Sequence, residues 1–160
     1  MMTTRTFAPW VEPIAAQLRE SRRAIEEVAR TIPDEAWLRP SPDPGWTYKD
    51  LLTHLAVGDW VCQMVLRAAV SGEPFDMSIT AQLDQRNAQL IQERSGRSVP
   101  DLVAEVAAEG EETQELLAQL TGAHEEQRQK GAPMSLGEYL RFFPQHDDEH
   151  LAQLRTALSK

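Results

Sequence analysis

Three histidines are the residues whose type and spacing suggest chemistry. His146 and His150 are four residues apart, which on a helix places both rings on one face, with β-carbons about 5–6 Å apart. His54 lies in line with Leu51 and Val61 at helical spacing, so its ring should point to the interior. Three neutral imidazoles with a fourth position open form the ligand set of a catalytic zinc site. The spacing alone leaves two alternatives open, a chance histidine pair and a hydrogen-bonded core histidine.

Amphipathic helices must position these histidines. The first is predicted by apolar residues that recur every three, four or seven positions and end before Pro33: Trp10, Ile14, Leu18, Ile25, Val28 and Ile32. Thr47 and Asp50 have the spacing of a capping box, which predicts the start of a second helix. We expect this helix to carry His54 and to continue to about Val70.

Two further helices are predicted after the end of the second helix. A shorter, more polar helix is predicted over residues 78–94, inside a long connection. Ser98 is a suitable N-cap for the next long amphipathic helix, and Gly122 is placed to close it.

The last helix carries the histidine pair. Ser135 and Glu138 have the spacing of a second capping box and predict its start. Pro144 would remove the hydrogen bond to the Leu140 carbonyl, so we predict an irregularity just before His146.

The helix order predicts the fold class. No segment alternates as a strand does, and 160 residues suit one domain. Four long helices and one extended crossover, which contains the short extra helix, predict an all-α four-helix bundle in a single domain over residues 1–160.

Charge and composition exclude several classes of function. A formal net charge of −9 opposes binding to phosphate backbones, so we expect no nucleic-acid partner. Arg19, Arg22 and Arg23 come closest to a basic patch, but acidic residues surround them, as on a solvated helix face. The single cysteine, Cys62, lies among apolar residues and should be a buried, unreactive thiol.

The chain shows no targeting or membrane signal. Residues 1–10 lack the apolar core of a signal peptide, and the most apolar stretch is too short to span a bilayer. We therefore expect a cytoplasmic protein without membrane contact.

Two segments resemble a known family. Residues 45–56 (GWTYKDLLTHLA) and residues 146–154 (HDDEHLAQL) together resemble the DinB superfamily of DinB/YfiT-like metalloenzymes. The resemblance implies an up-down-down-up bundle in which His54, His146 and His150 bind one divalent metal ion. It also implies a relation to thiol-dependent S-transferases and to mycothiol-dependent maleylpyruvate isomerases.

The expected function follows from the resemblance and the ligand set. We expect a metal-dependent thiol S-transferase that uses zinc, nickel or iron with a low-molecular-weight thiol and acts on a small electrophile. One alternative is a hydrolase that uses a metal-bound hydroxide. Another is a non-catalytic, metal-stabilised bundle that works by association. In each case we expect a homodimer.

Other residues near the histidines have two interpretations each. Three carboxylates are candidates for orienting the second ring nitrogens or for ordinary solvated helix charges: Asp50, Asp147 and Glu149. Three aromatic residues are candidates for a substrate pocket or for plain core: Trp46, Trp60 and Phe143. His124, beside Glu125 and Glu126, is expected at the surface.

Overall fold

The computed structural model describes residues 5–159, so the first residues of the segment tested for a signal peptide lie outside it. The regular elements in this range are helices, and no strand occurs among them. The α-helices are α1 (Glu12–Ala29), α2 (Tyr48–Val57), α3 (Trp60–Ser71), α4 (Leu83–Glu93), α5 (Val99–Leu117) and α6 (Leu136–Arg155). No helix in the described range is long and apolar enough to cross a membrane.

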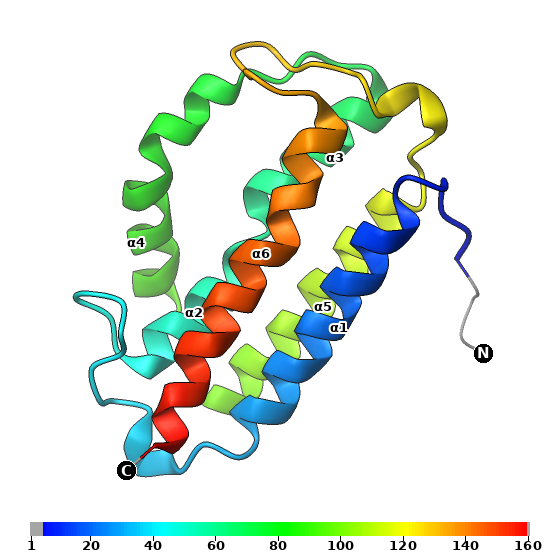
Figure 1. Ribbon diagram of the computed structural model, residues 1–160. Coiled ribbons are helices and arrows are strands. Elements are labelled where there is room, and N and C mark those ends of the chain that lie inside the picture. The colour runs from blue at the N-terminus through cyan, green and yellow to red at the C-terminus, as the bar shows by residue number, and fades with distance from the viewer. Residues whose placement is uncertain (1–4, 160) are drawn as a thin grey trace.

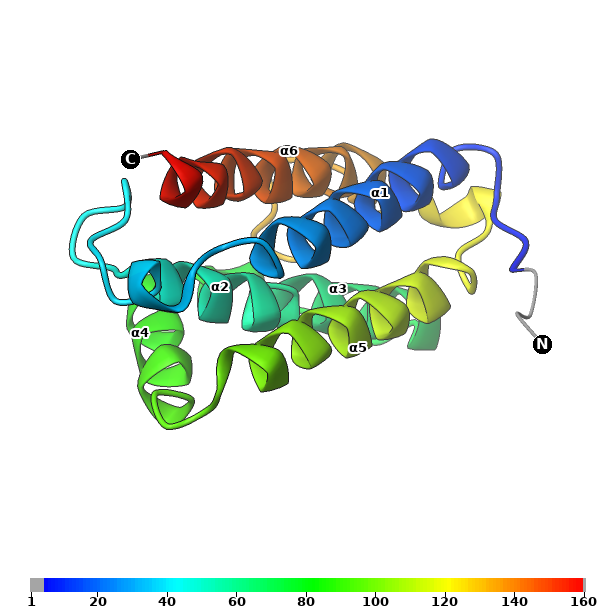
Figure 2. The same cartoon turned by 90° about the horizontal axis from the view of Figure 1, so that it is seen from below.

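The helices form the predicted all-α bundle. Helices α1 and α6 lie side by side and run in the same direction, while α2–α3 and α5 run the opposite way (Figure 1). This is the up-down-down-up order. Helix α4 belongs to the long crossover and lies against α2, outside the four main helical segments (Figure 2).

The predicted capping boxes set two helix starts. At α2, the Asp50 backbone N–H donates to Thr47 Oγ1 (3.1 Å), and the Thr47 N–H donates to Asp50 Oδ2 (2.9 Å). At α6, Ser135 and Glu138 make the same reciprocal pair at 3.3 and 2.7 Å. Each box satisfies backbone donors that a helix start leaves unpaired, and an N-cap contributes about 1 kcal/mol.

Several helix ends differ from the prediction. Helix α1 ends at Ala29, short of Ile32. The Arg30 N–H still bonds to the Glu26 carbonyl (3.2 Å), but the Thr31 N–H bonds to the Val28 carbonyl (2.9 Å), which tightens the last turn. Helix α5 starts after the predicted N-cap Ser98 but ends at Leu117, and Gly122 instead opens a short 3-10 turn. The helix predicted over residues 78–94 consists of a 3-10 turn, Met77–Gln82, followed by α4.

The second predicted helix is divided, because α2 ends at Val57 and α3 begins at Trp60. The Leu55 carbonyl accepts a hydrogen bond from Arg22 Nη1 (2.9 Å), and two residues later α2 ends. Gly58 lies at the junction. A β-carbon there would lie 2.9 Å from the His54 carbonyl oxygen, which is too close, and at an ordinary 3.7 Å from His146 Cε1, so the backbone at the end of α2 favours glycine at this position.

The last helix is not interrupted where Pro144 predicted an irregularity. Helix α6 is continuous from Leu136 to Arg155, with Pro144 buried inside it. Pro144 therefore does not break α6 before His146, and the direction of the histidine pair does not depend on a break. A single missing N–H donor is accommodated within a long helix that packs against α1 along its length.

The core has two apolar halves with a polar layer between them. One half contains Leu51, Leu55 and Leu154, and the other contains Leu18 and Leu66. On α1, for example, the two halves are separated by a stretch that includes Ser21 and Arg22. Cys62 is in the second half, where burial raises the pKa of its thiol, as an unreactive cysteine requires.

Arg22 is the centre of the polar layer. Its guanidinium is 6% exposed and donates through Nε to Asp147 Oδ2 (2.9 Å) and through Nη2 to Asp59 Oδ1. Thr113 Oγ1 also donates to Asp59, at 2.8 Å from Oδ2. Asp59 and Asp147 are 2% and 1% exposed. The layer thus joins α1, α5, α6 and the junction between α2 and α3.

The burial of Arg22 corrects the prediction that it shares a solvated face with its neighbours. Arg19 and Arg23 are exposed as expected. Arg22, however, falls four residues after Leu18 and three before Ile25, so it lies on the buried stripe of α1. The two carboxylates that neutralise it come from distant parts of the chain.

Removal of the Arg22 charge should destabilise the protein severely. The Arg22→Met variant leaves Asp59 and Asp147 buried without their cation, and we expect the free energy of unfolding to fall by about 3–5 kcal/mol. Urea denaturation followed by circular dichroism measures this loss. The matched control Arg23→Met, on the exposed side of α1, should change stability by less than about 0.5 kcal/mol. A similar small effect at both positions would contradict the network.

An alanine at the helix junction should also destabilise the fold. In Gly58→Ala the new β-carbon meets the His54 carbonyl, so we expect a loss of about 1–3 kcal/mol, as for overpacked sites. The control Gly110→Ala places its β-carbon at an ordinary 3.4 Å from Arg22 Cγ inside α5. It should be neutral or stabilising by up to about 1 kcal/mol, because alanine favours helix. Equal effects at both glycines in urea denaturation would show that position 58 tolerates a side chain.

Candidate metal centre

The bundle brings the three histidines together at the level of the polar layer. His54 Nε2 on α2 lies 3.2 Å from His146 Nε2 on α6. The ring centroid of His150 lies 4.8 Å from that of His54 and 4.5 Å from that of His146. One nitrogen from each ring lies within 4.8 Å of the others, so the group could hold a metal ion.

A neighbouring side chain orients one of the three rings through a hydrogen bond. His150 Nδ1 lies 2.7 Å from Gln153 Oε1, which can only accept, so Nδ1 carries the proton and Nε2 keeps its lone pair. His146 Nδ1 lies 3.5 Å from Asp147 Oδ1, which is long for a hydrogen bond. His54 Nδ1 is buried and has no hydrogen-bond partner within residues 5–159.

Burial in the bundle favours the neutral form of the His54 and His150 rings. Burial, with further contributions from His150 and His146, lowers the pKa of His54 to about 3. Burial also lowers the pKa of His150. Burial alone would raise the pKa of Asp147, but Arg22 and His146 outweigh this effect and lower it, so the carboxylate is charged. At neutral pH the site therefore presents the uncharged imidazoles of His54 and His150 beside an ionised carboxylate.

The nitrogen geometry fits a divalent metal ion. Two nitrogen ligands of a tetrahedral zinc, each at 2.0–2.1 Å, are about 3.3 Å apart, close to the 3.2 Å between His54 and His146. Without an ion, the two Nε2 atoms can approach this closely only if one carries a proton. Three neutral imidazoles suit zinc, nickel and iron, and they leave coordination positions open.

The three predicted carboxylates occupy different environments. Asp147 is buried between Arg22 and His146, as described above. Asp50 accepts its hydrogen bonds from Thr47 in the capping box of α2. Glu149 is exposed on α6. Of the three, the structure brings Asp147 to the histidines and gives Asp50 a role in starting the helix.

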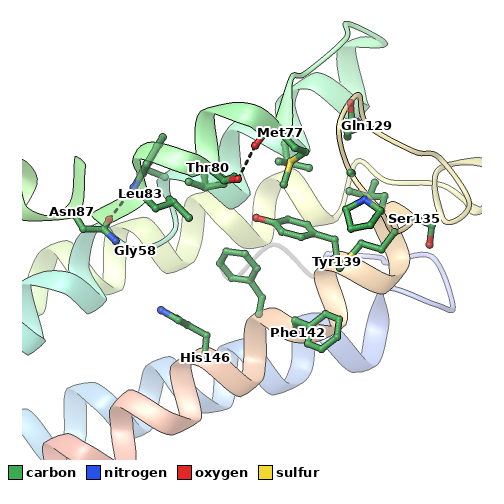
Figure 3. A pocket seen from close by; sticks show the side chains of 18 of the residues that line it. Gly58, Met77, Thr80, Leu83, Asn87, Gln129, Ser135, Tyr139, Phe142 and His146 are labelled. Atoms are coloured by element: carbon green, nitrogen blue, oxygen red, sulfur yellow. Dashed lines mark hydrogen bonds between the residues drawn. The ribbon is translucent and has the colours of Figure 1, made fainter. Parts of the chain in front are cut away.

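A cavity of about 400 Å³ opens beside His54 and His146 (Figure 3). Its walls come from α3, the crossover, α6 and the loop before α6. Of the three predicted aromatic residues, Trp60 and Phe143 line this cavity. Trp46 instead packs against the His54 ring, with centroids 4.9 Å apart and planes inclined by 46°. The volume is within the range typical of small-molecule sites.

Three residues of the site were not foreseen. Gln153 is three positions after His150 on the same helix, so helical spacing could have identified it as a partner of that ring. Arg22 was detectable as the residue that continues the apolar stripe of α1 between Leu18 and Ile25. Tyr139 lines the cavity one turn before Phe143. His124 lies apart, where its Nδ1 accepts from the Thr121 N–H (2.8 Å).

Comparison with known proteins agrees with this geometry. No curated protein and no solved structure matches the chain. The family model described as the DinB superfamily matches residues 17–154. That range contains all three histidines and every α-helix except the ends of α1 and α6. The chain therefore belongs to the DinB superfamily.

Proposed function

We propose that the protein binds one divalent metal ion and transfers a small thiol to a small electrophile. One observation carries the proposal: three imidazoles converge beside a largely apolar cavity. The resemblance to a family that includes thiol-dependent S-transferases supports the choice of a sulfur nucleophile. An apolar cavity also suits an organic electrophile better than water as the reacting partner.

In this proposal the three histidines hold the ion through their Nε2 atoms. When bound, the ion lowers the pKa of a thiol in its open coordination position and so supplies a thiolate at neutral pH. Gln153 fixes the protonation of His150. Asp147, held by Arg22, faces His146 Nδ1 and favours the proton on that atom.

The cavity residues then position the electrophile. Trp60 and Phe143 contribute walls that exclude water from the space next to His54 and His146. In the transfer the sulfur forms a bond to the electrophilic carbon, and the leaving group departs with the bonding electron pair. The proton of the thiol passes to the leaving group or to solvent, so the step needs no oxidant or reductant.

Metal content tests the first half of the proposal. Protein expressed without a histidine tag should contain about one divalent ion per chain by inductively coupled plasma mass spectrometry. His150→Ala should retain a small fraction of it because one of three ligands is lost. The control His124→Ala removes a histidine outside the cluster and should keep the full content. No ion in the parent protein, even after metal is added back, would reject the proposal.

Thiol binding tests the second half. Cobalt substituted into the site should give visible absorption bands that change when 2-mercaptoethanol is added, with a new sulfur-to-cobalt band in the near ultraviolet. Ethanol, its match without the thiol, should leave the spectrum unchanged at the same concentrations. If the spectrum of the cobalt-loaded protein does not change with 2-mercaptoethanol, the metal site stands but the proposed thiol chemistry is rejected.

A further inference from the structure

No acidic side chain, lysine or arginine of residues 5–159 lines the cavity beside the histidines. Its lining residues include no aspartate, glutamate, lysine or arginine, although the chain has 25 acidic and 16 basic residues. Apolar side chains provide most of the lining, among them Val61, Val65, Leu83, Leu136 and Phe143. Away from the histidines, where the proposed ion would bind, a charged ligand would lose its hydration and find no ion pair in exchange, which is costly. The cavity therefore selects against charge.

The Tyr139 hydroxyl in the lining is free to bind a ligand. Tyr139 belongs to the same face of α6 as Phe143, His146 and His150, at successive spacings of four, three and four residues. Its ring packs edge-on against Phe143, with centroids 5.6 Å apart. Figure 3 shows the hydroxyl directed into the cavity. No hydrogen bond to another residue of the range 5–159 engages it.

Three other polar side chains of the lining already have hydrogen-bond partners in the protein. Asn87 Oδ1 accepts from Trp60 Nε1 (3.3 Å), and Thr80 Oγ1 donates to the Met77 carbonyl (2.7 Å). Ser135 Oγ accepts from Glu138 in the capping box of α6.

Gln129 presents a second free hydrogen-bond donor to the cavity. Its Oε1 accepts from the Phe75 N–H (3.3 Å), which fixes the orientation of the amide, and its Nε2 is buried without a partner. Burial raises the pKa of the Tyr139 hydroxyl, so at neutral pH it too is a donor. The Tyr139 hydroxyl and Gln129 Nε2 can therefore both donate a hydrogen bond to an acceptor atom of a ligand.

We propose that the substrate held in this cavity is an uncharged, mainly apolar molecule with an acceptor oxygen, such as a carbonyl, that accepts a hydrogen bond from Tyr139 Oη. The inference rests on the proposed function, because it describes the electrophile of the same site. Tyr139 and His146 are seven residues apart, which is about 10 Å along the helix axis. The hydrogen bond thus anchors the substrate at some distance from the histidine cluster.

Three ligands of the same shape test this chemistry. The probes are 4-phenylbutan-2-one, butylbenzene, which lacks the oxygen, and 3-phenylpropionate, which carries a carboxylate. Ligand-observed NMR titrations on the full chain, treated with a chelator and checked for helicity, give the affinities without direct coordination to a metal. The ketone should bind at least about tenfold more tightly than the carboxylate, because the cavity cannot compensate a charge.

A single-atom variant locates the contact. Tyr139→Phe should weaken ketone binding about three- to tenfold, the size of one hydrogen bond, and leave butylbenzene binding unchanged. Tyr48→Phe is the matched control, since the Tyr48 hydroxyl pairs with Thr156 outside the cavity. It should change neither affinity.

Two results would overturn the inference: a carboxylate that binds as tightly as the ketone, or ketone binding that Tyr139→Phe leaves intact. Metal content and the cobalt spectrum separate this failure from failure of the proposed function. Metal and thiol binding without discrimination among the probes would reject the uncharged substrate alone. Ketone selectivity through Tyr139 in a protein that binds no metal would support the cavity inference and reject the transferase.

Discussion

The structure depends on the burial of one guanidinium. A cation in the core is tolerated only when carboxylates neutralise it and its N–H groups are hydrogen-bonded. Arg22 meets this requirement with Asp147 of α6 and with Asp59 and the Leu55 carbonyl at the junction of α2 and α3, two segments that lie far from Arg22 and from each other in the sequence. These segments must therefore lie at the same level along the bundle axis as Arg22. The apolar residues of the core lie on both sides of this layer and keep water away from it.

The same constraint places the histidine cluster. Asp147 follows His146 directly, so the ion pair with Arg22 also fixes where α6 presents its histidines. On the opposite side, the hydrogen bond from Arg22 to Leu55 lies at the end of α2, next to His54. The histidine rings and the Arg22 network thus form adjacent parts of one polar layer. The first part is the ion-pair network of Arg22, and the second part is the histidine cluster next to the cavity.

A charged network and an uncharged cavity perform different tasks within the bundle. The network gives the helices one register, since a shift of α1 by one residue would remove the partners of Arg22. The cavity, bounded by the crossover and by α6, contains no such charges and is open to small molecules. Tyr139 and Phe143 line it on the same helical face that carries the histidines. A single helix thereby connects the candidate metal centre with the candidate substrate space.

The sequence by itself determined the features that depend on residues close together in the chain. Helical periodicity identified the bundle, Thr47 and Ser135 marked two helix starts, and the spacing of His146 and His150 indicated one face of one helix. The resemblance of two short segments supplied the topology and the family, and the match over residues 17–154 agrees with it. These signals are local because caps and helical faces involve neighbours within one or two turns.

Only the tertiary structure decided which distant groups meet. The apolar stripe of α1 includes the position of Arg22, but only Asp59 and Asp147, from other segments, provide the charges that allow a cation to be buried there. The division between α2 and α3 was likewise not visible in the spacing of their residues, and Arg22 of α1 donates a hydrogen bond to the Leu55 carbonyl at this helix end. The free energy of a buried charge or a close backbone contact is set by partners across the bundle, and sequence spacing carries no record of them.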